Sequence, residues 1–488
     1  MQTRREQVRA YRFVTRRIVS AMLSGEPETA DLPMRRLALA LFGSAMIATI
    51  VFAGVGVYGL LRPGGGTPTA NALIIEKETG ARYVYLDNVL YPVLNYTSAR
   101  LILGTATPTV KSMSHQSLRG LPRGRTVGIT GAPDALPDRA ALVGLPWSVC
   151  SAPRSVDLPT PASHLFIGSV PDGGAALGES ALLVNSDGDQ NVRYLLWHDH
   201  RLRIKDRSVL ASLSMSAATP VTVSDALLNA VTPGPDLAPV TPEDAGKPSG
   251  HQVGGQTAKI GQLYHLEDQH FVMLAAGLVP ISDVVRLLLT VGGQEAEISP
   301  ADVARTQVDT RLEPDGYPTK IPALHQVAGD QPAVCAAYRG GDATHRDVAV
   351  EMFDTAPGTL TLPPGDGTYQ IVNGQRLVDR IVVRGGQAAL VQQLPAPNST
   401  ATGATVYVVT DQGVKYAIPT RTADAMTALG YQGLTATPVP AALLALVPTG
   451  PSLDPAAAKS FTGRPAPGPT RSPTPKPKAS GTPTPGSR

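Results

Sequence analysis

Residues that could do chemistry are few and scattered in this 488-residue sequence. The best metal candidate is "WHDH" (197–200), because His198 and His200 would share one face of a strand. Zinc usually takes three or four protein ligands, so two histidines alone favour a polar hairpin connection over a metal site. The segment "NSDGDQN" (185–191) starts like a calcium loop but lacks the glycine required at the sixth position and the glutamate required at the twelfth. It also predicts a hairpin turn.

Motifs for nucleotide binding and hydrolysis are absent from the sequence. No G-x-x-x-x-G-K-[ST] loop occurs, and the one Gly-Lys pair, Gly246-Lys247, is followed by Pro248. No H-E-x-x-H, G-x-S-x-G or S-x-x-K pattern occurs either. We therefore predict no catalytic residue, no cofactor and no metal ion.

An uncharged apolar segment covers residues 37–61, "LALALFGSAMIATIVFAGVGVYGLL". It exceeds the roughly 20 residues that a helix needs to cross a membrane. A buried core helix is rarely apolar on all sides over such a length. A signal peptide has a shorter apolar region and a cleavage site, which this sequence lacks. The segment predicts a retained, single-pass transmembrane helix.

The basic residues around this segment predict its orientation. Eight arginines precede the segment, whereas only Arg62 and then Lys77 follow it closely. Because basic flanks stay on the cytoplasmic side, we expect a cytoplasmic amino terminus and an extracytoplasmic remainder. The residues that we expect to serve topology or docking are Arg5, Arg9, Arg12, Arg16, Arg35 and Arg36.

The segment "RREQVRAYRFVTRRI" (4–18) is basic and amphipathic. Four arginines recur at spacings of four, three and four, which places them on one side of a helix. A nucleic-acid-binding arm is disfavoured, since the net charge is only +3 and a membrane span follows. A targeting peptide is disfavoured by the missing cleavage site. We expect a cytoplasmic helix at the inner leaflet or against partner subunits, with a neighbouring apolar stripe of Val8, Tyr11, Val14, Ile18 and Met22.

The two cysteines, Cys150 and Cys335, both lie beyond the predicted span. An extracytoplasmic compartment is oxidising, so this pair is expected to form a disulfide, with two free buried thiols as the alternative. Such a bond would unite two segments that are distant in the sequence. We expect it to clamp a central domain, because the sequence offers those segments few other reasons to meet.

An internal repeat occurs four times after the span. Each copy predicts an apolar strand, a polar turn, a second strand with an aromatic residue (Tyr83, Tyr194, Phe271 or Tyr416) and two short helices. The predicted fold is α+β: a single-pass membrane protein whose elongated ectodomain has four β-turn-β-helix repeats around a central β-rich domain, with quasi-two-fold symmetry. Glycine and proline, 48 and 45 residues, suit such short elements.

The same patterns predict the domain limits. They are a cytoplasmic amphipathic basic helix (1–36), a transmembrane helix (37–61), a linker (62–71), repeat 1 (72–137), a first segment of the central domain (138–175), repeat 2 (181–240), a linker (241–260), repeat 3 (261–307), a second segment of the central domain (308–397), repeat 4 (404–453) and a disordered, Pro-rich basic tail (454–488).

Several long motifs resemble the EccB family, a core membrane component of the type VII (ESX) secretion system of actinobacteria. The resemblance spans nearly the whole chain. It rests on "RREQVRAYRFVTRRIVSAML" (4–23), "TGARYVYLDNVLYPVLNYTSARLI" (79–102), "LPRGRTVGITGAPDALP" (121–137), "WSVC" (147–150) and the second cysteine at 335.

The resemblance implies a structural subunit of a secretion complex in the cytoplasmic membrane. Its expected partners are EccC, EccD and EccE, with the protease MycP nearby, and it forms homo-oligomers through its ectodomain. The family is likewise described with four repeats, a central domain and one disulfide. Two alternatives stay open: an ATPase activity, by which some family members are labelled, and a module that binds the cell wall (peptidoglycan).

Overall fold

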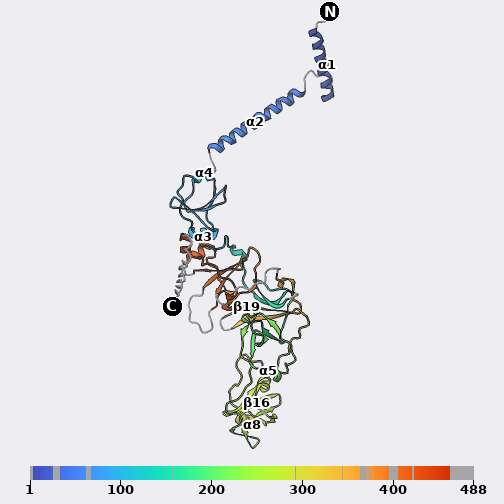
Figure 1. Ribbon diagram of the computed structural model, residues 1–488, viewed down its shortest axis with the longest axis vertical. Coiled ribbons are helices and arrows are strands. Elements are labelled where there is room, and N and C mark those ends of the chain that lie inside the picture. Colours follow the sequence, from blue (N-terminus) through green and yellow to red (C-terminus); the bar gives the residue numbers. More distant parts are fainter. Residues whose placement is uncertain are drawn as a thin grey trace, which may run out of the picture. The chain divides into compact units, whose positions relative to one another are not determined.

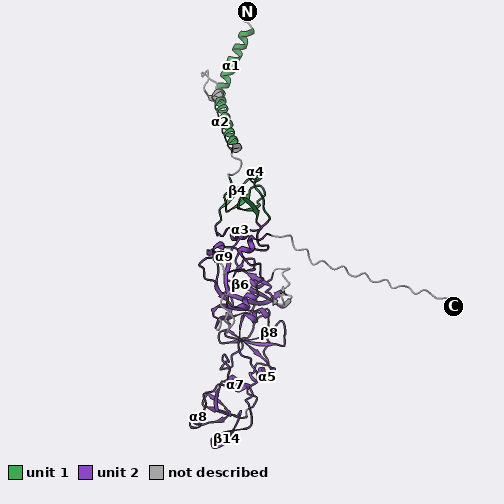
Figure 2. Cartoon of the chain, turned by 90° about the vertical axis from the view of Figure 1, so that its left-hand side faces the viewer, with its two compact units in different colours: residues 1–92, 108–125 green, residues 93–107, 126–488 purple. Residues whose placement is uncertain are grey.

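The computed structural model describes residues 4–25, 33–61, 67–155, 158–291, 293–342, 345–362, 371–372, 375–394, 405–419 and 423–461. The chain divides into two compact units (Figure 2). Unit 1 contains Met1–Pro92 and Pro108–Arg125, and unit 2 contains Val93–Thr107 and Thr126–Arg488. Each unit is described by itself below.

Unit 1 begins with two long helices, α1 (Arg4–Ser24) and α2 (Pro33–Leu61) (Figure 1). Within α2, residues Leu37–Tyr58 are long and apolar enough to cross a membrane, and none of this stretch is buried against protein. In water such exposure of apolar surface would be unfavourable, whereas in lipid it is not. The predicted apolar helix is therefore present. Helix α2 begins at Pro33, four residues before the predicted span of 37–61.

Unit 1 also contains a four-stranded sheet in the order β3-β2-β1-β4. Its first strand pairs antiparallel with β2 and parallel with β4. The apolar side chains Ile74, Tyr83 and Leu90 form a buried core with Met113 and Leu118. The strands are β1 (Ala72–Glu76), β2 (Arg82–Leu86), β3 (Val89–Pro92) and β4 (Val110–Met113), followed by helix α4 (His115–Leu118).

Three further sheets, all in unit 2, repeat this strand order. In each, the first strand pairs antiparallel with the second and parallel with the fourth. Their strands are β8 (Ala181–Ser186), β9 (Arg193–Trp197), β10 (His200–Ile204) and β11 (Val221–Val223), with β12 (Thr232–Pro233) added at one edge; β15 (Leu263–Leu266), β16 (Gln269–Leu274), β17 (Gly277–Ile281) and β18 (Ala296–Glu297); and β24 (Ala388–Gln393), β25 (Val406–Thr410), β26 (Lys415–Ile418) and β27 (Thr437–Val439).

Short helices follow the third and the fourth strand of every sheet, so the chain order is βββαβα four times. Side chains of Ser and Asp residues cap the amino termini of many of these helices. For example, the Ser224 hydroxyl accepts a hydrogen bond from the amide of Leu227. Such caps satisfy amides that the first helical turn leaves unpaired. The helices in unit 2 are α3 (Tyr96–Leu103), α5 (Arg207–Ser212), α6 (Asp225–Ala230), α7 (Asp283–Leu288), α8 (Pro300–Thr306), α9 (Ala423–Leu429), α10 (Ala441–Ala445) and α11 (Pro455–Lys459).

The β-turn-β-helix unit predicted from the sequence differs from these modules in two ways. The predicted unit lacks the third strand of the first three modules and the short parallel strand between the helices, because each of these strands has at most five residues. In the fourth copy it also begins too late. Strand β24 is the first strand of that sheet, whereas the sequence pattern assigns residues 308–397 to the central domain. The pair β25–β26, predicted as strands one and two, forms strands two and three.

A six-stranded sheet in unit 2 brings together two segments that are distant in the sequence, in the order β23-β6-β5-β19-β20-β7 (Figure 1). One face packs against α6 and α10 in an extensive apolar core around Trp147 and Tyr338. The other face holds the two cysteines in a smaller core. The strands are β5 (Trp147–Ser155), β6 (Leu158–Ile167), β7 (Ala175–Ala176), β19 (Ala333–Gly341), β20 (Arg346–Phe353) and β23 (Arg380–Val382).

Two predicted connections are structured. The linker predicted at 241–260 contains a hairpin of β13 (Pro248–Val253) and β14 (Gln256–Lys259), in which Val253 and Ala258 are buried. The tail predicted at 454–488 begins with helix α11, whose Ala458 is buried. Residues 462–488 of that tail lie outside the described residues. The remaining short elements are η1 (Arg139–Ala141), η2 (Gly358–Leu360), β21 (Ile371–Val372) and β22 (Gln375–Arg376).

Candidate functional site

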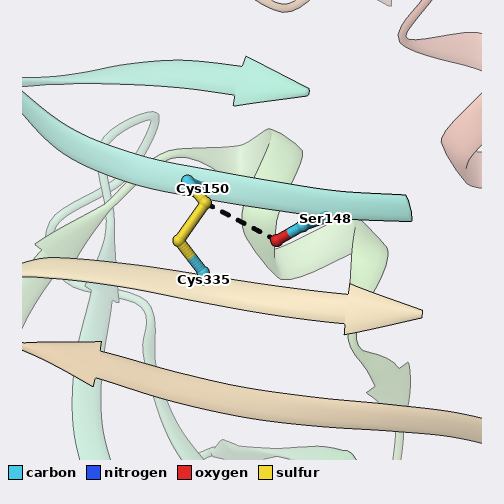
Figure 3. The surroundings of a disulfide bond; sticks show 3 residues. All are labelled: Ser148, Cys150 and Cys335. Carbon is cyan, nitrogen blue, oxygen red and sulfur yellow. Dashed lines mark hydrogen bonds between the residues drawn. A yellow bond between two sulfur atoms is a disulfide. The ribbon is translucent and has the colours of Figure 1, made fainter. Parts of the chain in front are cut away.

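The disulfide predicted from the sequence is present in the six-stranded sheet (Figure 3). Cys150 on β5 lies directly opposite Cys335 on β19, and both are fully buried. The Ser148 hydroxyl lies 3.6 Å from Cys150 Sγ. Phe166, Phe353 and other apolar residues surround the bond, so water is excluded from it.

The two cysteine segments have a further reason to meet, which the sequence did not indicate. They pair through an antiparallel ladder that runs from Trp147↔Tyr338 to Ser151↔Val334. The disulfide therefore reinforces a strand pairing that backbone hydrogen bonds and apolar packing already favour. The segments would therefore have reason to meet without it.

A buried histidine, His164, lies beside the disulfide in this sheet. On β6 it is the direct neighbour of Cys150, and on its other side it pairs with Arg380 of β23. The ring is fully buried, and neither of its nitrogens has a hydrogen-bond partner among the residues that the structure describes. Burial lowers the pKa of His164 to about 4, and the positive charge of Arg380 acts in the same direction. The ring is therefore neutral at pH 7.

Asp379, which directly precedes Arg380 in the sequence, forms a buried ionic network. Its carboxylate accepts hydrogen bonds from the amide and hydroxyl of Ser163, both at 2.8 Å, and from the Arg154 guanidinium at 2.9 Å. Burial alone would raise the pKa of Asp379, but these hydrogen bonds outweigh it, and the pKa lies below its usual value. The network ties the segment before β23 to strands β5 and β6.

We expect Asp379→Asn to lower the free energy of unfolding by about 2 kcal/mol at pH 7, because charge-assisted hydrogen bonds to a buried carboxylate are lost. Urea unfolding followed by circular dichroism measures this loss. Asp268→Asn, at an exposed carboxylate, serves as control. The advantage of the wild type should be complete above pH 3.8 and fade as the pH falls through the folded-state pKa. Equal stability of the two variants at pH 7 would contradict the assignment.

The basic residues expected to serve topology or docking lie on the two helices of unit 1. Helix α1 is continuous over the four arginines, so the spacing of Arg5, Arg9, Arg12 and Arg16 places them on one side, and all four are exposed. None of them forms an ion pair within the described residues of the chain. The neighbouring apolar residues are also exposed, for example Tyr11 at 74% and Met22 at 85%. Arg35 and Arg36 lie in the first turn of α2.

The other candidates from the sequence lie in turns. His198 and Asp199 connect β9 to β10, and His200 begins β10. The His198 ring contacts the Glu179 carboxylate, and the His200 ring contacts the Asp199 carboxylate. The segment 185–191 covers the end of β8 and most of its connection to β9, and Gly246-Lys247 precedes the β13–β14 hairpin. Within the described residues, no group of three or more His, Cys, Asp or Glu side chains could hold a metal ion.

These observations define a class of protein: a membrane protein with one apolar helix near its amino terminus, followed by small α+β modules and a disulfide-bonded sheet. The chain belongs to the EccB family of type VII secretion proteins. The family model described as "Type VII secretion system ESX-1, transport TM domain B" matches residues 1–463.

Individual relatives agree with this assignment. The ESX-3 secretion system ATPase EccB3 of Mycolicibacterium smegmatis is 30% identical, over 92% of this chain and 89% of that protein. The solved structure of an EccB3 dimer from the ESX-3 core complex is 27% identical, with a TM-score of 0.63, over 80% of this chain and 100% of that one. A chain in the intact ESX-5 inner membrane complex shares the fold, at 24% identity and a TM-score of 0.64, over 95% of this chain and 96% of that chain.

Proposed function

We propose that this chain is a structural subunit of a type VII (ESX) secretion complex in the cytoplasmic membrane, and that its extracytoplasmic region forms a scaffold. The observation that carries this proposal is the family match over residues 1–463, which includes both the membrane helix and the modules. A membrane protein with a large extracytoplasmic domain suits such a role, because its anchor and its assembly surfaces belong to one chain.

The proposed orientation places the amino terminus in the cytoplasm. Arg35 and Arg36 and the arginines of α1 precede the membrane helix, and such basic flanks remain on the cytoplasmic side. A disulfide between Cys150 and Cys335, both beyond that helix, is consistent with an oxidising compartment on the far side.

We also propose that the four βββαβα modules are copies of one unit, arranged with quasi-two-fold symmetry about the six-stranded sheet. Two helix pairs support this pairing of modules. Helix α3 contacts α9, where the Arg100 guanidinium donates to the Ala428 and Leu429 carbonyls. Helix α5 contacts α7 within the other pair, where apolar side chains of both helices share one core. Helices α6 and α10, the second helices of two modules, meet on one face of the sheet.

The proposed partners are EccC, EccD and EccE, with MycP nearby, together with further copies of this chain. Support comes from the relatives: one solved structure is an EccB3 dimer and another is an ESX-5 inner membrane complex. Affinity purification of the full chain from membranes in mild detergent tests the proposal. We expect an EccC-like ATPase and an EccD-like multispanning protein to co-purify, and purification of the chain without either would contradict a role in the complex.

The basic face of α1 is the region of this chain that we expect to dock on partners or on the inner leaflet. We expect the combined change Arg5→Gln, Arg9→Gln, Arg12→Gln and Arg16→Gln to reduce recovery of partner subunits by at least about tenfold, since four cations at roughly 1 kcal/mol each near an anionic surface exceed the 1.4 kcal/mol of a tenfold effect. Quantitative mass spectrometry of the purified complex measures recovery.

A matched control is available on the same helix. Arg4 and Arg17 lie off the side shared by the other four arginines, so Arg4→Gln with Arg17→Gln should leave partner recovery close to wild type. Membrane insertion is checked in parallel by carbonate extraction, because arginines also influence topology. Full recovery of partners with the fourfold variant would exclude α1 as a docking element.

The word ATPase in the name of the M. smegmatis relative supports a second candidate activity. The sequence has no G-x-x-x-x-G-K-[ST] loop to hold the phosphates in the usual way. Hydrolysis of ATP by the detergent-purified chain, measured through successive purification steps, tests this activity. Turnover that stays in constant proportion to the chain would establish it.

A further inference from the structure

A cavity of about 700 Å³ in unit 2 has three arginines in its lining: Arg201, Arg346 and Arg376. They come from three different elements, namely β10, the start of β20, and β22. Residues of α6 and α10 complete much of the lining, where these two helices meet on the six-stranded sheet. The lining of this cavity does not include the disulfide, the buried histidine or the basic helix α1.

The charges of the lining are unbalanced. Asp225 is the one carboxylate among the lining residues, and its Oδ1 already accepts a hydrogen bond from the Ser186 hydroxyl. Arg376 is held in place by Asp187, at 2.6 Å. In contrast, neither Arg201 nor Arg346 has a carboxylate within ion-pair distance in the portion of the chain that the structure describes.

The guanidinium of Arg201 is partly removed from water in this arrangement. Its guanidinium lies over the Tyr194 ring, 5.6 Å from the ring centre, and the side chain is half-buried. Burial lowers the pKa of Arg201, and the electrostatic contributions of Tyr194 and Asp225 only partly offset the loss of water around the cation. An anion in the cavity would restore the lost interactions.

The chemistry of the lining indicates which anion would bind. Guanidinium groups donate pairs of parallel hydrogen bonds to oxyanions, and phosphate offers several oxygens and more than one negative charge. Arginines on separate elements can approach different oxygens of one such group. The cavity is also large enough for more than a single phosphate, since small-molecule sites occupy roughly 300–1,000 Å³.

We propose that the cavity lined by Arg201, Arg346 and Arg376 is a binding site for a phosphate-bearing ligand. Arg201 and Arg346 neutralise the phosphate charge, and the Asp187–Arg376 pair positions the third guanidinium. The site is independent of the proposed scaffold function: a chain that assembles normally could still bind this ligand or fail to bind it.

Isothermal titration calorimetry of the full chain in mild detergent and phosphate-free buffer, with pyrophosphate as ligand, tests the proposal. We expect one binding site per chain. Arg201→Gln and Arg346→Gln should each weaken binding by about tenfold, as expected for one charge-assisted hydrogen bond, and the double variant should abolish it. Arg203→Gln is the matched control, because Arg203 is on the same strand, is exposed and does not line the cavity.

Further titrations separate the possible outcomes. Binding of ATP tighter than that of pyrophosphate would identify a nucleotide as the ligand, whereas equal binding would indicate the phosphates of another molecule. Thermal unfolding without ligand verifies that each variant is folded. If Arg201→Gln does not fold, Arg346→Gln carries the test. The proposal would be overturned if millimolar pyrophosphate did not bind, or if Arg203→Gln weakened binding as much as Arg201→Gln does. It would also be overturned if citrate bound as tightly as pyrophosphate.

Discussion

Reduction of the Cys150–Cys335 disulfide is expected to lower the free energy of unfolding of this protein by about 5 kcal/mol. The bond closes a loop with a sequence separation of 185 residues. In the chain-entropy account, a cross-link over such a loop removes about 5 kcal/mol of conformational freedom from the unfolded chain. The expected loss is at least about a third of the usual net stability of about 5–15 kcal/mol for a folded domain.

The native sheet should nevertheless survive reduction under mild conditions, because the ladder between β5 and β19 remains. Far-UV circular dichroism of the chain unfolded and refolded in reductant should therefore match that of the oxidised chain. The measured effect is a shift of the urea midpoint of the purified chain to lower concentration when unfolding is followed with and without reductant.

The variant with Cys150→Ala and Cys335→Ala is the control for this experiment. Alanine avoids a new unsatisfied polar group in an apolar core. The double variant should unfold near the midpoint of the reduced wild type, and reductant should have no further effect on it. A reduced wild type that unfolds at the same urea concentration as the oxidised protein would show that the bond does not stabilise the fold.

The features that could be predicted from the sequence depend on local patterns. The apolar run at 37–61 needs no knowledge of tertiary structure, since its length and lack of charge are sufficient. The two cysteines could be paired because the chain has no others. Similarly, caps such as Ser224 and polar turns such as 185–191 are short-range signals.

The features that could not be predicted depend on contacts between distant segments. Strand β24 is separated from its partner β25 by residues 394–405, a longer connection than the turn between the first two strands of the other sheets, so the fourth predicted module begins too late. The cavity with Arg201, Arg346 and Arg376 joins residues that are up to 175 positions apart (376 − 201). Nothing near His164 in the sequence indicates that both of its ring nitrogens are buried without partners among the described residues.

The burial of His164 leads to the second large expected effect, a loss of stability in mild acid. Above pH 6.5 the ring is neutral in both the folded and the unfolded state, so it does not influence stability. As the pH falls from 6.5 to about 4, the unfolded chain binds a proton that the folded ring cannot accept. We expect the free energy of unfolding to fall by about 3 kcal/mol over this window, at 1.36 kcal/mol per pKa unit.

Urea unfolding at several pH values between 8 and 4 measures this effect, and His164→Leu isolates it. The variant removes the titrating ring together with its two nitrogens, so its stability should decline less steeply than that of the wild type in this window. His345→Gln, at an exposed histidine, should keep the wild-type dependence. Carboxylates such as Asp379, whose pKa lies below 3.8, lose their stabilising charge only at still lower pH. Parallel pH profiles for His164→Leu and the wild type would mean that the His164 ring is protonated in the folded protein, with Arg380 beside it, at the same pH as in the unfolded chain.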